Sequence, residues 1–323
     1  SGYSPEASAI TQPTMKWTGA ASVNWDEATA NWSVNGSPSV YLDGSSIRFD
    51  DTALSNVTIN VLATVSPSIM VVSNSSKSYS FSGNDISGTG SILKLGNGTV
   101  TFNVANTYSG GTTLSNGMIV IGNGDALGTG PITADAGTLK WTYTTGNGAL
   151  ANSIVVNGPV TFDTSAGNWT QTGPITGSGT ITRGISGVLS LYLGGDNSGF
   201  TGTYQDQNSA NSVTRFTANT AGSASAHWIF NQPALGRTSL PTTSGTIRFG
   251  SFSGSGTLSD GGAGIMNTVE VGALGLNDTF SGVIGAFGGY IGLTNVGTGT
   301  RTLLGANTYT GSNNITAGKL IIS

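Results

Sequence analysis

The sequence predicts an all-β protein whose chain winds into coils that stack on one another. Residues 106–122 and 307–323 align without a gap, and both keep Asn-Thr-Tyr, a hydroxyl residue, Gly, a turn Gly and a final apolar strand. Short segments elsewhere alternate apolar and polar residues between turn residues, which is typical of strands. Glycine occupies 51 of 323 positions and only 8% are charged, a composition that disfavours helices. A recurring strand-and-turn unit indicates a solenoid, which offers a surface rather than a pocket.

The expected strands follow one another along the whole chain. Each candidate alternates with period 2 and is bounded by Gly, Asn, Asp or Pro, so that successive side chains point to opposite faces. The best helical segment, 149–154, is too short to matter. The expected strands are 47–49, 57–61, 99–104, 118–121, 138–143, 188–193 and 245–249.

A longer unit recurs four times and consists of a Gly-x-Gly turn, a strand and a turn with an aromatic residue, a hydroxyl residue and Gly. Glycine suits corners that need a positive φ, and Asn tolerates the same conformation. The copies are unevenly spaced, which indicates loops that interrupt the coils and often carry function. We expect Tyr108 and Tyr309 to be scaffold residues. The aromatic residues of the four copies are Tyr108, Phe200, Phe280 and Tyr309.

Charge and hydropathy exclude several classes of partner. The net charge is −4 with 11 Lys and Arg, which argues against nucleic acid and against attraction of acidic polysaccharides by overall charge. No apolar run approaches the roughly 18 residues of a membrane span, and no signal sequence is seen, so we expect no membrane insertion of this segment. The apolar content of 37% is enough for a continuous core.

Several segments together resemble the autotransporter-associated β-strand repeat. They are residues 87–102, 105–113 and 124–130, preceded by a Trp-bearing head that includes 47–51. The resemblance implies a single-domain right-handed parallel β-helix, with an N-terminal cap and first coils in 1–82 and continuous repeats in 83–323. It also implies a bacterial protein that is secreted or at the cell surface. Members serve as passenger stalks, adhesive surfaces or non-catalytic modules of plant-polysaccharide-degrading enzymes.

A catalytic site has little support in the sequence. The single His227 lies beside Trp228 and is interpreted as a half-exposed polar residue, and the arginines do not cluster in sequence. Asp50 and Asp51 form the densest carboxylate pair, but Asp-Asp after a strand is also a normal turn. Carboxylates could still meet across coils, as a hydrolase requires. We assign no catalytic residue, metal or cofactor, although turn oxygens could hold a structural Ca²⁺.

Aromatic residues suggest a sugar-binding surface, because flat amphipathic rings cover the apolar faces of sugars. The head tryptophans 17, 25 and 32 are interpreted as a cap. Farther along, the intervals from Tyr143 to Trp169 and Tyr192 approximate one coil, which predicts an aromatic ladder pointing either into the core or outward as a platform. The polar region 205–220 is either an insertion beside that platform or a solvated loop. The predicted carbohydrate-binding residues are Trp141, Tyr143, Trp169, Tyr192, Gln205, Gln207 and Trp228.

Three functional hypotheses follow. The first is a monomeric, non-catalytic carbohydrate-binding module for a plant cell-wall polysaccharide, with xylan favoured, tethered in the full-length protein to a catalytic domain. The second is a structural passenger or stalk segment of a bacterial surface adhesin. The third is a β-helix glycoside hydrolase or polysaccharide lyase with carboxylates assembled across coils.

Overall fold

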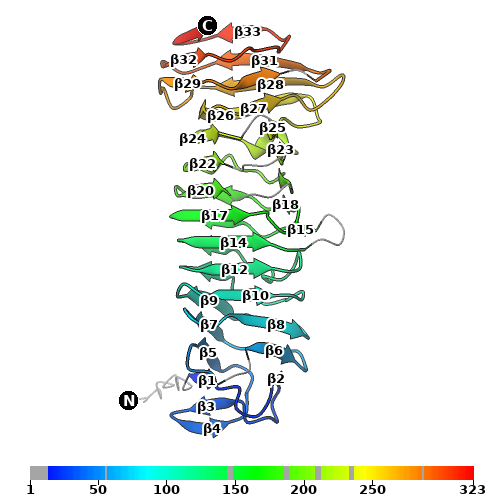
Figure 1. Ribbon diagram of the computed structural model, residues 1–323, viewed down its shortest axis with the longest axis vertical. Coiled ribbons are helices and arrows are strands. Elements are labelled where there is room, and N and C mark those ends of the chain that lie inside the picture. The colour runs from blue at the N-terminus through cyan, green and yellow to red at the C-terminus, as the bar shows by residue number, and fades with distance from the viewer. Residues whose placement is uncertain are drawn as a thin grey trace, which may run out of the picture.

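A computed structural model describes residues 14–54, 57–143, 148–184, 189–207, 212–232, 236–285 and 287–323. These form one right-handed parallel β-solenoid of about 12 coils, as the sequence predicts. Figure 1 shows the coils stacked into a column, with the N-terminal coils at one end and the C-terminal coils at the other. In the described part the only helix is a 3₁₀ turn at Asn219–Ala221, and no helix there is long and apolar enough to cross a membrane.

One 14-stranded sheet runs the full height of the solenoid and takes one strand from each successive coil. All its neighbouring strands are parallel, which is the pairing that stacked coils produce. In spatial order its strands are β2 (Asn24–Trp25), β6 (Thr58–Val61), β8 (Tyr79–Gly83), β10 (Thr99–Phe102), β12 (Met118–Ile121), β14 (Gly137–Trp141), β17 (Pro159–Asp163), β20 (Thr180–Arg183), β22 (Thr203–Asp206), β24 (Ser223–Phe230), β26 (Gly245–Ser253), β28 (Met266–Val271), β31 (Tyr290–Asn295) and β33 (Asn313–Ile315).

A second, 10-stranded sheet covers the N-terminal half of the column. It is parallel except at its first end, where a short antiparallel hairpin folds across the opening. In spatial order it comprises β19 (Ile175–Thr176), β16 (Ile154–Val156), β13 (Ile132–Ala134), β11 (Thr112–Leu114), β9 (Ser91–Leu95), β7 (Ile69–Ser73), β5 (Ser46–Asp50), β1 (Met15–Trp17), β3 (Trp32–Val34) and β4 (Ser37–Ser39).

Two further sheets complete the C-terminal half. A seven-stranded sheet, here called the lateral sheet, comprises β15 (Ala149–Leu150), β18 (Trp169–Gln171), β21 (Leu191–Leu193), β23 (Val213–Phe216), β25 (Arg237–Ser239), β27 (Thr257–Ser259) and β30 (Val283–Gly285). A three-stranded sheet comprises β29 (Asp278–Phe280), β32 (Thr300–Leu303) and β34 (Lys319–Ile322).

The predicted strands are confirmed, with small shifts at their ends. The predicted 138–143 is β14, which ends at Trp141, and the only described strand in 188–193 is β21. The weak helical candidate 149–154 contains β15 and the first residue of β16, so tertiary pairing overrides its composition.

The core is formed by the inward half of each alternating strand. In β10, Val100 and Phe102 are buried while Thr99 and Thr101 are half-buried, and the same pattern repeats from coil to coil. Parallel register places like side chains above one another, so Phe81 stacks on Phe102 with ring centroids 5.3 Å apart. Burial of these continuous apolar columns drives the coils to stack.

The N-terminal end is capped as the sequence predicts. Trp17, Trp25 and Trp32 are at most 1% exposed. Their rings pack edge-on or tilted against one another and against Phe49 of the first full coil. Large rings close an end that would otherwise expose core side chains to water.

The two near-copies form the same local structure. In each copy the Tyr hydroxyl bonds to the side chain four residues later, Tyr108 to Thr112 at 2.5 Å and Tyr309 to Asn313 at 2.8 Å. The Asn of each Asn-Thr-Tyr accepts the N–H of a residue in the preceding coil: Asn106 takes that of Ile86 at 2.8 Å, and position 307 does the same. The motif therefore fastens one coil to the one before it, which is a scaffold role.

The near-copies nevertheless lie on different sides of the column. Strands 91–95 and 99–102 belong to the 10-stranded and 14-stranded sheets, whereas the matching strands 290–295 and 300–303 belong to the 14-stranded and three-stranded sheets. Between the first copy and the second, the strands of the repeat unit have therefore moved to the next side of the column. The lateral sheet fills the coils between them, where the sequence repeat is weakest.

Candidate binding surface

The predicted tryptophans lie in the core. Trp141 and Trp169 are both 0% exposed and stack with ring centroids 5.9 Å apart and planes 9° from parallel. Trp228 is 2% exposed and donates its indole N–H to the Ser223 carbonyl at 3.2 Å. Of the two orientations that the sequence allows, the inward one is found. These three rings present no face to a sugar in this structure.

The register of the predicted aromatic ladder is different in the structure. Trp169 pairs with Leu191, and Tyr192 pairs with Thr170 on one side and Arg215 on the other. A shift of one residue moves a side chain to the opposite face of a strand, so Trp169 points inward and Tyr192 outward. Tyr143 follows the end of β14 and is half-buried against the Trp141 ring.

Most of the described part of the polar region 205–220 is regular structure. It contains the end of β22, all of β23 and the first two residues of the 3₁₀ turn, while residues 208–211 lie outside the described residues. Gln205 is half-buried within β22, and the exposed Gln207 donates its amide to the Gln205 side-chain oxygen at 2.9 Å. The two amides lie together, as the prediction of a polar binding edge requires, but on a different sheet from Tyr192.

The catalytic candidates lie in structural contacts. His227 is half-buried, with Nε2 3.2 Å from the Ser253 hydroxyl of the next coil. Asp50 accepts from the Thr52 backbone and hydroxyl within its own turn. Asp51 accepts backbone N–H groups from residues 75–77 of the next coil at 2.9–3.1 Å, which lowers its pKa to about 2. The turn interpretation of this pair therefore holds.

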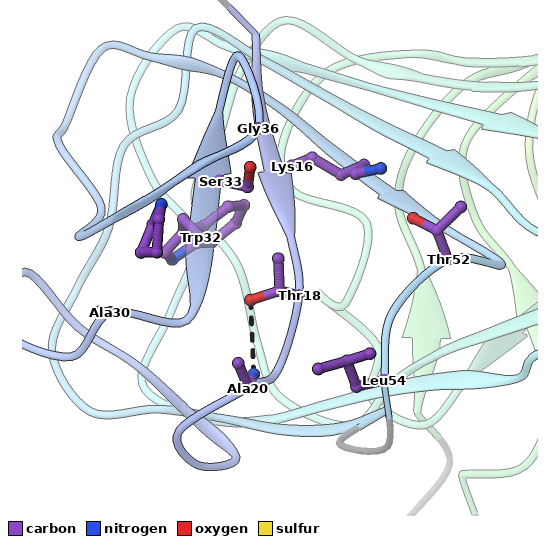
Figure 2. A pocket seen from close by; sticks show the side chains of 10 residues that line it. Lys16, Thr18, Ala20, Ala30, Trp32, Ser33, Gly36, Thr52 and Leu54 are labelled. Carbon is purple, nitrogen blue, oxygen red and sulfur yellow. Dashed lines mark hydrogen bonds between the residues drawn. The ribbon is translucent and has the colours of Figure 1, made fainter.

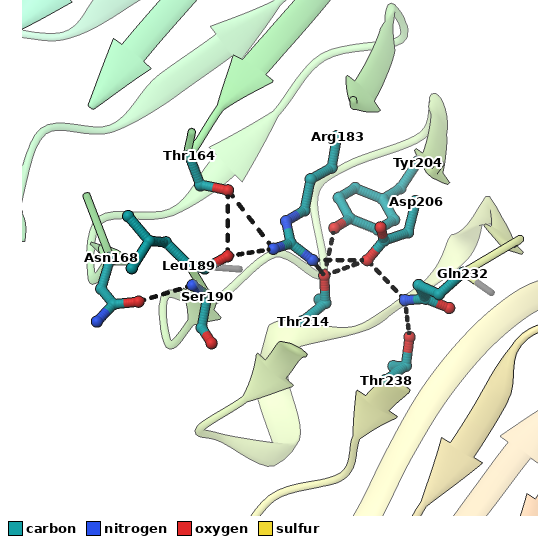
Figure 3. A network of polar contacts seen from close by, with 10 residues as sticks. All are labelled: Thr164, Asn168, Arg183, Leu189, Ser190, Tyr204, Asp206, Thr214, Gln232 and Thr238. Atoms are coloured by element: carbon teal, nitrogen blue, oxygen red, sulfur yellow. Dashed lines mark hydrogen bonds and ion pairs between the residues drawn. The ribbon is translucent and has the colours of Figure 1, made fainter. Parts of the chain in front are cut away.

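A buried polar network spans several coils (Figure 3). Arg183 and Asp206 are both 0% exposed, and the guanidinium donates to the carboxylate at 3.2 Å. The Thr214 hydroxyl accepts from Arg183 at 2.9 Å and donates to Asp206. Burial and the nearby Asp206 charge raise the pKa of Tyr204 well above its usual value. With both charges sealed from solvent, the network is a structural element of the core.

Two other buried cations serve the scaffold. Arg301 pairs with Asp278 and lies 5.5 Å over the Phe252 ring. Lys94 donates to the carbonyls of Leu95 and Gly96 at 2.7 Å each, and its burial lowers its pKa to about 8. In the described part of the chain, no group of three or more His, Asp or Glu side chains could hold a metal ion.

One cavity of about 270 Å³ opens beside the N-terminal cap (Figure 2). Its lining is largely apolar and includes the edge of Trp32, Pro38 and Leu54, of which Leu54 is 71% exposed. The one hydrogen bond drawn among its side chains joins the Ala20 N–H to the Thr18 hydroxyl at 3.4 Å. Convergent charges, which a specific polar ligand requires, are lacking apart from Lys16 at its edge.

A second cavity of about 250 Å³, here called the arginine pocket, opens on the lateral sheet. Arg215 of β23 pairs in register with Ser239 of β25, and Ser239 pairs with Ser259 of β27, so three successive coils each supply one lining side chain. Arg237 and Phe287 complete the rim, with the guanidinium carbon 5.6 Å from the ring centroid. Sequence patterns did not indicate this pocket, because its lining residues are far apart along the chain.

Comparison with known proteins supports the repeat but covers little of the chain. The model of the passenger-associated transport repeat matches residues 92–121 and 293–322. Both matches coincide with the near-copies and their preceding strands. No curated protein and no solved structure is significantly similar to the chain.

Proposed function

We propose that this chain is a passenger or stalk segment of a bacterial secreted or surface protein, in which the solenoid is a stiff spacer. The observation that carries the proposal is that both matches to the passenger-associated transport repeat fall on coils of an uninterrupted parallel stack. A repeat found in transported passengers, folded here as a column, fits a part that is exported and then holds other parts in place.

The structure has the physical properties that a spacer needs. Backbone hydrogen bonds join every coil to its neighbours along the 14-stranded sheet, and its stacked apolar columns resist bending. The first and last described coils lie at opposite ends of the column (Figure 1). Few of the surface residues are charged, and the absence of cysteine means that folding after export requires no disulfide.

Surface display tests this proposal. The chain is placed between a signal sequence and the outer-membrane translocator of an autotransporter in a laboratory Gram-negative bacterium, with an epitope ahead of residue 14. We expect antibody to label the epitope on intact cells, and added protease to leave the solenoid uncut. In the matched variant Ile119→Asp, which places a charge at a fully buried position, we expect degradation. Retention of the folded wild-type segment inside the cell would contradict the proposal.

Binding of xylan stays a prediction with less support. Its strongest candidates, Trp141, Trp169 and Trp228, are enclosed, which leaves Tyr143, Tyr192, Gln205 and Gln207 as accessible residues. Affinity electrophoresis in xylan gels, with product analysis, would test both this prediction and the enzyme alternative.

A further inference from the structure

We propose that the arginine pocket binds a carboxylate-bearing sugar, a uronic acid unit of an acidic polysaccharide. The stalk proposal says nothing of such a ligand, so either proposal can fail alone. Four observations carry the inference: two arginines without an acidic partner among the described residues, the hydrogen bonds made by the only carboxylate in the pocket lining, an exposed aromatic ring and a second aromatic residue on the neighbouring strand.

Arg215 and Arg237 differ from the other arginines in having no acidic partner among the described residues. Four of the chain's arginines have an Asp or Glu oxygen within 3.2 Å, at positions 48, 183, 248 and 301. No acidic group of the described residues lies within ion-pair distance of Arg215 or Arg237. Guanidinium groups without an acidic partner are available to form charge-assisted hydrogen bonds with a bound anion.

The carboxylate of Asp260 is held by backbone N–H groups and forms an ion pair with neither arginine. Asp260 is 4% exposed, and one oxygen accepts the backbone N–H groups of Phe287 and Gly289 at 2.7 and 2.8 Å. The other oxygen accepts the N–H of Gly262 at 3.1 Å. Its role is to fix the turn that carries Phe287, and the two guanidinium groups stay available to a ligand.

The remaining lining groups fit a sugar. Phe287 is 62% exposed and can cover the apolar face of a pyranose ring. Ser239 and Ser259 are 3% and 2% exposed and form the buried floor of the pocket, where their hydroxyls donate to backbone carbonyls at 3.3 Å. Guanidinium groups suit a carboxylate, which arginine binds in a bidentate manner. A volume of about 250 Å³ is below the usual range for drug-sized ligands and suits a single sugar unit.

A second aromatic residue neighbours the pocket. Tyr192 pairs in register with Arg215 and is half-buried on the outward face of the preceding coil. Neighbouring strands are about 4.8 Å apart, so Tyr192 is within reach of the next unit of an extended chain bound at the arginines. The net charge of −4 opposes long-range attraction of acidic chains, so recognition must be local.

The test is affinity electrophoresis and calorimetry with polygalacturonate at 50 and 150 mM salt, with unsubstituted xylan and dextran sulfate as comparison polymers. We expect polygalacturonate to retard the wild-type protein. Arg215→Gln and Arg237→Gln should each weaken binding about tenfold or more. Arg248→Gln is the matched control, because it removes the same charge from an exposed arginine on the 14-stranded sheet, and it should leave binding unchanged.

Several outcomes would overturn the proposal. Absence of retardation by polygalacturonate is one, and an equal loss in Arg248→Gln, which would indicate diffuse charge attraction, is another. Tighter binding of dextran sulfate than of polygalacturonate would overturn the carboxylate assignment. If Arg215→Gln does not fold by circular dichroism, the exposed Arg237 still decides the question, since its replacement leaves no buried group unpaired.

Discussion

Asp51 shows how a single side chain fastens one coil to the next. Its carboxylate accepts N–H groups from Lys77, Ser75 and Ser76, all in the turn of the following coil. These hydrogen bonds favour the charged form and lower the pKa to about 2 from its ordinary value of 3.8. A carboxyl with a depressed pKa stabilises the fold above its unfolded-state pKa, and that contribution is lost as pH falls toward the folded-state value.

Replacing this residue gives a prediction with a definite sign. Asp51→Asn should lower the free energy of unfolding at pH 7, because an amide offers one acceptor oxygen and no charge. The difference from wild type should persist down to about pH 4 and then shrink as pH falls toward 2, where about half of the wild-type carboxyl groups are protonated. Urea unfolding followed by fluorescence between pH 2 and 7 measures it, and a difference that stays constant to pH 2 would contradict the assignment.

Charged residues in the core are the feature that sequence patterns could not anticipate. Arg183 and Asp206 occupy inward positions of β20 and β22, where alternation predicts apolar residues. Two such charges are tolerated because they meet in adjacent coils with Thr214 and Gln232 as further partners. That meeting depends on the register between coils, which sequence spacing does not define when the loops differ in length.

At the level of elements, the tight corners between strands restrict which residue types the chain can place there. Gly117 precedes β12 with a φ of +78°, and a Cβ there would lie 2.4 Å from the Gly96 carbonyl oxygen. The matching Gly318 of the second near-copy has a φ of +69° and the same restriction. The sequence-based expectation of glycine at corners with positive φ is confirmed at both positions.

Gly117→Ala should therefore lower stability by about 1–3 kcal/mol, through the strained φ and the close backbone contact. The control is Gly292→Ala in β31, where the nearest atom to a new Cβ lies 3.5 Å away and no positive φ is needed. The control should leave stability unchanged or slightly higher. Urea midpoints of the two variants compare them, and equal midpoints would show that the corner does not require glycine.

The strands themselves were predictable, but their assignment to sheets was not. Alternation gave β10 and β12 nearly residue for residue, because the inward and outward positions of a half-buried strand differ in polarity. The ladder from Trp169 to Tyr192 failed by one residue, which is enough to place them on opposite faces. An interval of about one coil predicts proximity and does not by itself predict the face.

At the scale of the whole molecule, the internal repeat was the most informative part of the sequence. The repeat predicted the solenoid. The interpretation of the head tryptophans as a cap is also correct, and the match to the passenger-associated transport repeat supports a passenger role. The rotation of the repeat between its two near-copies could not be predicted, because both sequences encode the same local unit. The arginine pocket lies on the lateral sheet, which occupies the coils between the two near-copies.

The distance between the ends of the column tests the central claim, a stiff solenoid that holds its ends apart, most directly. The chain has no cysteine, so spin labels can be attached at Thr58→Cys and Asn314→Cys, two exposed positions on β6 and β33. These strands are twelve spacings apart in the 14-stranded sheet, and at about 4.8 Å each this predicts a separation of about 58 Å. The pair Thr58→Cys and Arg248→Cys, nine spacings apart, should give about 43 Å.

Double electron–electron resonance measures both distances. The predicted result is two narrow distributions in the ratio of the strand spacings, unchanged when polysaccharide is added. A broad distribution for the longer pair, or a distance no greater than that of the shorter pair, would contradict a continuous stiff solenoid.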